Sequence, residues 1–156
     1  MSKKYGRIIL SAILCVVLGS VGGLFTASEI TGWYQSLNKP AWNPPNWLFG
    51  PVWTLLYLMM GIAAAQVWNQ QSIYKTRALQ LFGLQFCLNL LWSFLFFNRH
   101  WIGVALVEII LLWVLIVLTI RSFYKVRPSA ALLLLPYVLW VTFAAFLNGA
   151  FFILNR

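Results

Sequence analysis

Five long stretches of the chain are almost entirely apolar, and short segments that carry most of the charges and prolines separate them. Each stretch has about the 20 residues that an α-helix needs to cross the hydrocarbon layer of a bilayer. None alternates strictly between polar and apolar positions, as a barrel strand would. The pattern therefore predicts an all-α integral membrane protein, a single domain over residues 1–156. Its five transmembrane helices are expected to cover about residues 8–27, 47–68, 78–97, 102–123 and 130–154.

The composition agrees with this class of protein. Of the 156 residues, 62% are hydrophobic and 8% are charged, whereas a soluble domain is about one quarter charged. A disordered chain would be rich in charge and poor in aromatic residues. The first apolar stretch follows basic residues, as in a signal peptide, but it is longer than the usual apolar region and no A-x-A cleavage site follows it. We expect it to be a retained helix.

The charge is strongly positive, with eleven Lys and Arg against two acidic residues. The basic residues lie in small groups between the apolar stretches, which is typical of membrane anchors and not of a nucleic-acid-binding surface. With five spans, one side of the membrane carries Lys3, Lys4, Arg7, Lys75, Arg77, Arg121, Lys125 and Arg127. The other side carries Lys39, Arg99 and Arg156. This bias predicts a cytoplasmic N-terminus and an outward first loop in a bacterial cell membrane.

The loop between the first two stretches, about residues 28–46, has an unusual composition. Its prolines restrict the backbone and remove hydrogen-bond donors. It also contains Trp33, Tyr34 and Trp42, which are costly to leave in water. We therefore expect a structured loop that packs as a lid across the mouth of the bundle.

Three predicted helix faces combine aromatic and amide side chains. Residues three or four apart share a face of a helix, so the faces consist of Trp53 with Tyr57; of Gln85, Asn89 and Trp92; and of Tyr137, Trp140, Ala144 and Asn148. Polar groups in a transmembrane helix normally face the protein interior. If the three faces converge, they enclose a cavity for a flat apolar ligand. Alternatively, the amides simply link helices by hydrogen bonds.

Other residues offer little material for catalysis. Glu108 is the only acid within a stretch, and it is either functional or a neutral or paired carboxyl group. His100 is expected in an interfacial loop, and Cys15 and Cys87 are expected to be buried and reduced. Trp113 has no polar residue on its own face, so we assign it to packing or lipid contact. The chain has no Asp, so a Ser–His–Asp set is not expected. Its His, Cys and carboxylate residues do not cluster in the sequence, so a metal site is not expected either. Any chemistry would therefore be redox or photochemical.

Four segments of the chain resemble one known family. They read W-Y-x-x-L-N-K-P-x-W-N-P-P, G-P-V-W-T-x-L-Y, N-L-L-W-S and L-P-Y-V-L-W-V-T-F-A-A-F-L-N, in this order. The chain is similar to the translocator protein (TspO/MBR) family over nearly its whole length. Bacterial members are called tryptophan-rich sensory proteins, and mitochondrial members the peripheral benzodiazepine receptor.

The resemblance implies a five-helix bundle that forms a homodimer. A cavity closed by the first loop would bind porphyrins such as protoporphyrin IX, or benzodiazepine-type ligands, and no cofactor is required. The pocket residues that match the family are Tyr34, Trp42, Trp53, Tyr57, Asn89, Trp92, Trp140 and Ala144. Trp53 and Trp140 match the tryptophans linked to light-dependent porphyrin degradation in some bacterial members. The cholesterol motif of mitochondrial members needs a Tyr near the end of the fifth helix, where this chain has Phe151 and Phe152.

Three functions follow as hypotheses. The first is a membrane receptor or sensor that binds tetrapyrroles, and the second is an enzyme that degrades porphyrin in light. The third, the alternative, is a transporter of tetrapyrroles or sterols across the membrane, which inverted repeats or paired intramembrane charges would support. Gly19-x-x-x-Gly23 and Ala145-x-x-x-Gly149 are close-approach motifs that serve either internal packing or a homodimer interface.

Overall fold

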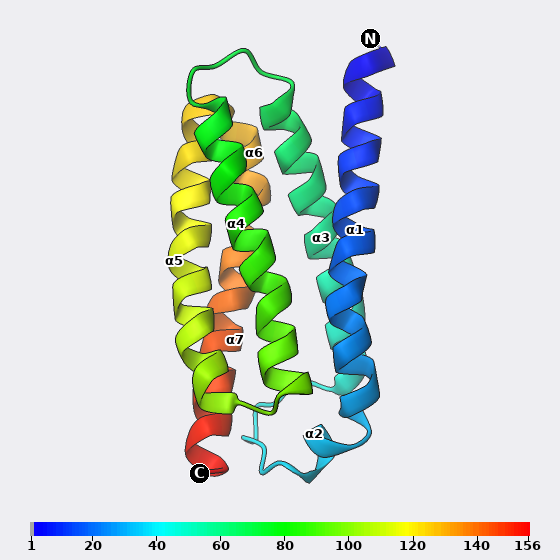
Figure 1. The fold of residues 1–156 in the computed structure, drawn as a ribbon, viewed down its shortest axis with the longest axis vertical. Coiled ribbons are helices and arrows are strands. Elements are labelled where there is room, and N and C mark those ends of the chain that lie inside the picture. Colours follow the sequence, from blue (N-terminus) through cyan, green and yellow to red (C-terminus); the bar gives the residue numbers. More distant parts are fainter. Residues whose placement is uncertain (1) are drawn as a thin grey trace.

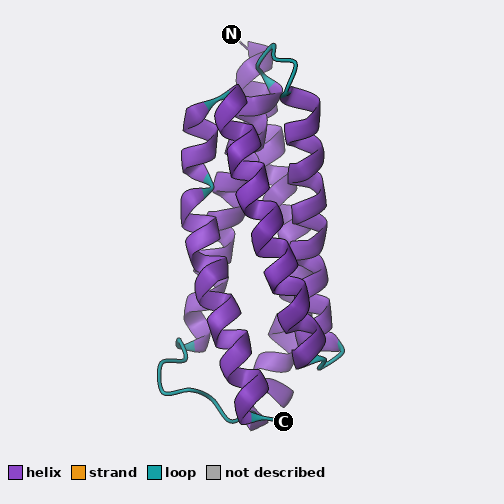
Figure 2. Ribbon diagram, turned by 90° about the vertical axis from the view of Figure 1, so that its left-hand side faces the viewer, coloured by secondary structure: helices purple, strands orange, loops and turns teal. Residues whose placement is uncertain are grey.

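The computed structural model describes residues 2–156, and over this range the chain is a bundle of long, nearly parallel helices without a strand (Figures 1 and 2). The long helices are α1 (Ser2–Ile30), α3 (Asn46–Trp68), α4 (Lys75–Ser93), α5 (Ile102–Val126) and α7 (Leu135–Leu154). The short ones are α2 (Trp33–Ser36), the π-helix η1 (Phe94–Asn98) and α6 (Pro128–Leu133).

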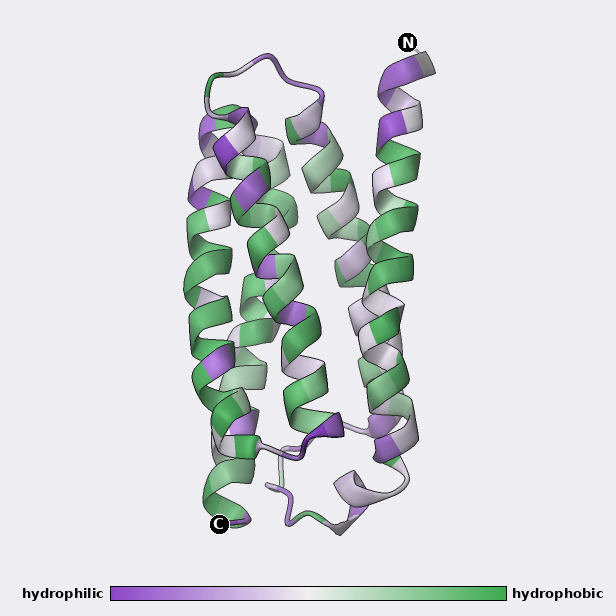
Figure 3. Ribbon diagram, in the orientation of Figure 1, coloured by the Kyte–Doolittle hydropathy of each residue, from purple (hydrophilic) through white to green (hydrophobic). Residues whose placement is uncertain are grey.

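Five helical segments are long and apolar enough to cross a membrane: Lys3–Ile30, Asn46–Trp68, Lys75–Asn98, Ile102–Val126 and Pro128–Leu154. Each of the five predicted stretches lies inside one of them. Hydrophobic residues cover the middle of the helices, and hydrophilic residues gather toward the two ends of the bundle (Figure 3). The prediction of an all-α integral membrane protein with five transmembrane helices is confirmed.

The fifth span consists of two helices. It is interrupted at Leu134, and α7 carries Pro136 in its first turn. Proline has no backbone N–H and its ring clashes with the preceding turn, which disfavours a continuous helix at this position. Leu134 instead donates to Ala131 O in a tighter turn (3.1 Å), and α7 then starts afresh.

The helices pack in a closed ring around the long axis. In this ring α1 contacts α3, α3 contacts α6, α5 lies between α4 and α6–α7, and α4 with η1 returns to α1. The N-terminus lies at one end of the bundle, and the C-terminus lies at the other end, next to α2 (Figure 1). The loop that contains α2 covers this second end (Figures 1 and 2).

The two ends of the bundle differ in how they are filled. Toward the N-terminus, Met60, Ala63, Val67 and Phe123 are fully buried and belong to one continuous apolar core. We call this end the packed half. The end next to α2 contains a cavity and is called the hollow half.

Candidate ligand-binding cavity

A cavity of about 440 Å³ lies inside the hollow half. All five spans and α2 contribute to its wall, as the segments Val16–Ile30, Asn46–Tyr57, Asn89–Phe97, Ile109–Leu112 and Trp140–Phe151 and the side chain of Tyr34. Cavities that hold small molecules have volumes of about 300–1,000 Å³ and mostly apolar walls. The size and the wall are therefore those of a site for a small organic ligand.

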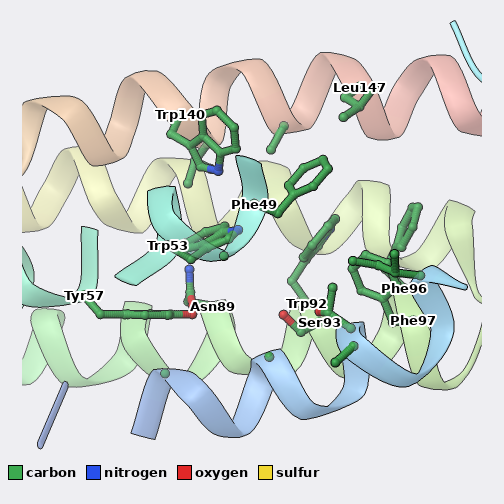
Figure 4. A pocket seen from close by; sticks show the side chains of 18 of the residues that line it. Phe49, Trp53, Tyr57, Asn89, Trp92, Ser93, Phe96, Phe97, Trp140 and Leu147 are labelled. Carbon is green, nitrogen blue, oxygen red and sulfur yellow. Dashed lines mark hydrogen bonds between the residues drawn. The ribbon is translucent and has the colours of Figure 1, made fainter. Parts of the chain in front are cut away.

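Aromatic rings from opposite helices face each other across this space. Trp140 on α7 points toward Phe49 and Trp53 on α3, and the Phe49 and Trp140 ring centroids are 6.2 Å apart (Figure 4). Trp53 is stacked on Tyr57 at 5.5 Å. On the opposite side Trp92 is stacked on Phe96 at 5.1 Å. The rings thus present flat faces and edges to the cavity, an arrangement that suits an aromatic guest.

The position of Tyr57 depends on a glycine of α1. A Cβ atom at Gly19 would overlap the Tyr57 ring, so this close approach of the ring requires glycine. Of the two alternatives for the Gly19-x-x-x-Gly23 motif, internal packing therefore holds for Gly19. The homodimer stays a prediction.

A chain of hydrogen bonds closes the cavity toward the packed half. Tyr57 Oη donates to Asn89 Oδ1 (2.7 Å), and Asn89 Nδ2 donates to Tyr137 Oη (3.1 Å). Tyr137 Oη in turn donates to Gln85 Oε1 (2.7 Å). The chain links α3, α4 and α7, and all four side chains are buried. The two predicted explanations of the amides thus apply together, because Asn89 links helices and also lines the cavity.

The second pair of predicted polar residues also bridges helices. Trp92 Nε1 on α4 donates to Asn148 Oδ1 on α7 (3.0 Å), and Asn148 Nδ2 donates to Ile102 O (3.0 Å). Among the hydrogen bonds within residues 2–156, none uses the indole N–H of Trp53 or Trp140. These two donors remain available to a ligand, while most other polar groups of the wall are already paired.

Tyr34 anchors the lid to the hollow half. Its side chain is 2% exposed, and its ring lies against Phe97 (5.7 Å) and Phe151 (5.4 Å). Its hydroxyl donates to Asn43 Oδ1 within the lid (2.9 Å), and Lys39 Nζ lies 4.9 Å from the ring centroid. Burial raises the pKa of Tyr34 to about 12, although the hydrogen bond with Asn43 acts in the opposite direction.

Two further contacts fasten the lid. Asn38 N donates to Asn155 Oδ1 (2.8 Å) and Asn155 Nδ2 donates to Asn38 O (3.0 Å), which joins the lid to the end of α7. Trp33 is stacked on His100 at 4.0 Å, and His100 Nε2 lies 3.1 Å from Glu29 Oε2. His100 sits in the loop after η1, as expected, with a left-handed φ of 58°. The expected structured loop is thus held at several points.

Seven of the eight predicted pocket residues line the cavity: Tyr34, Trp53, Tyr57, Asn89, Trp92, Trp140 and Ala144. Trp42 is not among the lining residues. It is 50% exposed and packs edge-on against Phe143. Sequence reasoning missed Phe49, Phe96 and Phe97. Phe49 lies four residues before Trp53, so extending that helix face by one turn would have found it.

One expectation about a single side chain was wrong. Cys15 is buried, but Cys87 is exposed on α4, where the neighbouring residues Gly83, Leu84 and Leu91 are exposed too. Both cysteines are free. Trp113 packs against α7, and its Nε1 donates to Thr142 Oγ1 there (2.8 Å), a partner that its own helix face does not offer.

Within residues 2–156, no Asp, Glu, Lys, Arg, His or Cys side chain lines the cavity. Glu108 is 8% exposed, does not line the cavity, and within residues 2–156 neither of its carboxyl oxygens has a hydrogen-bond partner. In the same range, no three His, Cys, Asp or Glu side chains lie together. Recognition in this cavity would therefore depend on shape, ring contacts and the free indole N–H groups.

The fold and the cavity define a class: helical membrane proteins with an aromatic binding cavity beneath a fastened extramembrane loop. The profile of the TspO/MBR family matches residues 11–154, and the chain belongs to this family. The predicted resemblance is confirmed, and the chain is an integral membrane protein.

Named relatives come from all three domains of life. The chain is 43% identical over 159 residues to the tryptophan-rich protein TspO of Chlorobaculum tepidum, covering 99% of each chain. It is 41% identical over 149 residues to the tryptophan-rich protein TspO of Archaeoglobus fulgidus, covering 96% of this chain and 97% of the relative. It is 39% identical over 131 residues to the translocator protein of Homo sapiens, covering 82% of this chain and 78% of the relative. This membership supports a membrane receptor role.

Proposed function

We propose that the protein is a membrane receptor or sensor that binds porphyrins, such as protoporphyrin IX and haem-related tetrapyrroles, in the aromatic cavity. The observation that carries this proposal is the pair of indole rings, Trp53 and Trp140, that meet from separate helices around the cavity of about 440 Å³. A porphyrin is a flat, apolar ring with two acidic groups at one edge. The cavity offers ring faces for the macrocycle, and the lid offers a cation for that edge.

Each part of a porphyrin has a counterpart in this site. Stacking and burial of apolar surface supply affinity, at about 25 cal/mol for each Å² removed from water. The indole N–H groups of Trp53 and Trp140 can orient the macrocycle. Lys39, whose ammonium group lies 4.9 Å from the ring of Tyr34, is outside the cavity wall but would pair with a ligand carboxylate that reaches the lid.

Benzodiazepine-type ligands fit the same chemistry, since they are also apolar and aromatic. We propose that they occupy the same cavity, so that a ligand of this type displaces the porphyrin competitively.

Equilibrium titration tests the site. Protoporphyrin IX is titrated into purified protein, and binding is followed both by the porphyrin absorbance band and by quenching of tryptophan fluorescence. The double variant Trp53→Phe/Trp140→Phe should bind about tenfold more weakly or worse, as expected when well-packed aromatic contacts are lost. Trp113→Phe is the matched control, because Trp113 lies outside the cavity and bonds to Thr142. Equal affinity of the double variant and the control would contradict the site.

Light-dependent degradation of the bound porphyrin is a second candidate function, which the contact of redox-active rings favours. Trp53 is stacked on Tyr57 and meets Tyr137 edge-on at 6.4 Å. An excited porphyrin can take one electron from the Trp53 indole, which leaves an indole radical cation and a porphyrin radical anion. Dissolved oxygen then adds to the porphyrin radical anion with formation of a C–O bond, and the electron returns to the indole. The porphyrin thereby gains two oxygen atoms and loses its conjugation, and Trp53 is restored. Under illumination in air, Trp53→Phe should slow the loss of porphyrin absorbance relative to Trp113→Phe, at equal occupancy. Equal rates in both variants would mean that the protein does not direct the chemistry.

We also propose that the protein lies in a bacterial cell membrane with its N-terminus in the cytoplasm. Eight basic residues belong to the end that holds the N-terminus, α6 and the α3–α4 loop, and three to the lid end. Basic residues favour the cytoplasmic side. The lid would then face outward. Protease accessibility of the lid in intact cells tests this orientation.

A further inference from the structure

The cavity is open on one side only. Its exposed lining residues all belong to two segments, Ser20–Ala27 on α1 and Asn46–Thr54 on α3. The lining residues on the other helices and on α2 are buried or half-buried. The cavity therefore reaches the surface between α1 and α3, and we call this gap the lateral opening.

The two helices part at a definite point. In the packed half they touch, since a Cβ at Gly61 would lie 2.5 Å from Ala12 Cα. Farther along, Gly19 on α1 still lies directly against the Tyr57 ring on α3. Beyond it, Gly23 on α1 and Gly50 on α3 have no atom within 4 Å of the position of a Cβ. The Tyr57 ring thus lies where contact ends, and the lateral opening begins beyond it.

Apart from Asn46 at the start of α3, the rim of the lateral opening is apolar although it contains hydroxyl groups. Ser20 Oγ donates to Val16 O (2.7 Å), and Thr54 Oγ1 donates to Gly50 O (2.9 Å). Each hydroxyl is thus satisfied by its own helix and needs no water. Gly50 and Thr54 lie within the helix Asn46–Trp68, which is long and apolar enough to cross a membrane, so we expect this part of the rim to face lipid. At 1.5 Å per residue, the stretch from Ser20 to Ala27 is about 10 Å long.

The aqueous end of the cavity is closed by contrast. Tyr34 is almost fully buried beneath the lid, and the reciprocal hydrogen bonds of Asn38 and Asn155 hold the lid against α7. A ligand that arrived from water would have to break these bonds. A ligand dissolved in the bilayer meets no such barrier at the lateral opening.

We propose that the cavity takes its ligand sideways from the lipid phase, through the lateral opening, and that its ligands are therefore aromatic molecules that partition into the membrane. This inference rests on the proposed function, because it concerns access to the same cavity. The lid then acts as a fixed cover, and the rim residues Gly23 and Gly50 determine how fast a ligand enters and leaves.

The test compares rates and affinity in lipid vesicles that contain the full chain. The variant Gly23→Phe/Gly50→Phe places two rings into the lateral opening, where there is room for them. Gly83→Phe is the matched control, because Gly83 is an exposed glycine of α4 with no atom near its Cβ position and no place in the cavity wall. Stopped-flow quenching by protoporphyrin IX gives association and dissociation rate constants, and an equilibrium titration gives the affinity.

We expect both the association and the dissociation rate constant of the Gly23→Phe/Gly50→Phe variant to fall about tenfold or more relative to the control, whereas a mere loss of contacts in the cavity wall would raise the dissociation rate constant. Asn155→Ala, which loosens the lid, should leave both rates unchanged. Unchanged rates in the double variant, or faster association in Asn155→Ala, overturn the lateral route while equilibrium binding stays intact. Absence of equilibrium binding in the wild-type protein would instead overturn the proposed function, and the route with it.

Discussion

The packed and hollow halves of the bundle use the same five helices but are built from side chains of different size. In the packed half, α3 reads M-M-G-I-A-A-A over residues 59–65, and its small residues let neighbouring backbones approach. In the hollow half the same helix carries Phe49, Trp53 and Tyr57. The hydrogen bond of Tyr57 and its stacking with Trp53 hold these rings around a space between the helices that they do not fill. The helix α3 therefore packs closely against its neighbours in one half and lines the cavity in the other.

This difference matters more in a bilayer than it would in water. Lipid tails are as apolar as leucine, so helices associate mainly through close packing and interhelical hydrogen bonds. The packed half supplies the close packing. The hollow half is held by the hydrogen bonds of Asn89, Tyr137 and Asn148, and by the fastened lid. A passage across the membrane would have to open the packed half, which is why the comparison favours a receptor over a transporter.

The largest expected effect comes from a bulky substitution at the closest helix contact. In Gly61→Val, the new Cβ would lie 2.5 Å from Ala12 Cα and 2.6 Å from Ser11 O. Backbone atoms cannot rotate away, so α1 must separate from α3. We therefore expect the free energy of unfolding to fall by about 3 kcal/mol or more. Gly23→Val in the hollow half should change stability by no more than about 0.5 kcal/mol, because no atom lies within 4 Å of its Cβ position. Thermal unfolding in detergent, followed by circular dichroism, measures both variants, and similar losses would contradict the division into two halves.

A smaller effect is expected where the two halves meet. Tyr137→Phe removes one hydroxyl and leaves Asn89 Nδ2 and Gln85 Oε1 without a partner in a buried place. An unsatisfied buried polar group costs about 1–3 kcal/mol. The matched control is Tyr124→Phe, because Tyr124 is 62% exposed, and its cost should be close to zero. If both variants unfold at the same temperature, the hydrogen-bond chain does not stabilise the boundary.

The sequence alone predicted the spans and most of the cavity wall, because both depend on regular spacing. Residues four apart on a helix share a face wherever that helix is placed, so Trp53 with Tyr57 and Asn89 with Trp92 could be grouped. Contacts between elements could not be found in this way. The hydrogen bond of Trp113 to Thr142 depends on how α5 packs against α7. Phe96 and Phe97 reach the cavity because they lie in a π-helix, which the spacing of residues in the sequence does not predict.

The lid shows the same limit. Its prolines and aromatic residues predicted order, but its main attachment joins Asn38 to Asn155, 117 residues later in the chain. No local pattern relates these two positions. Only the closed ring of helices, which brings the end of α7 beside the lid, places them together.

The smallest predicted effect concerns the pH dependence of this lid. Because burial raises the pKa of Tyr34 from 10.0 to about 12, the neutral hydroxyl is favoured in the folded state. Its contribution to stability is therefore complete below pH 10 and is lost as the pH rises to about 12. Below pH 10 the free energy of unfolding of the wild-type protein should exceed that of Tyr34→Phe by about 1 kcal/mol. This is the usual contribution of one hydrogen bond such as that to Asn43. Melting temperatures of both proteins between pH 8 and 12 test this, since the other tyrosines titrate equally in each. A constant difference across this range would mean that Tyr34 ionises as freely in the folded protein as in the unfolded chain, and that the lid does not exclude water from it.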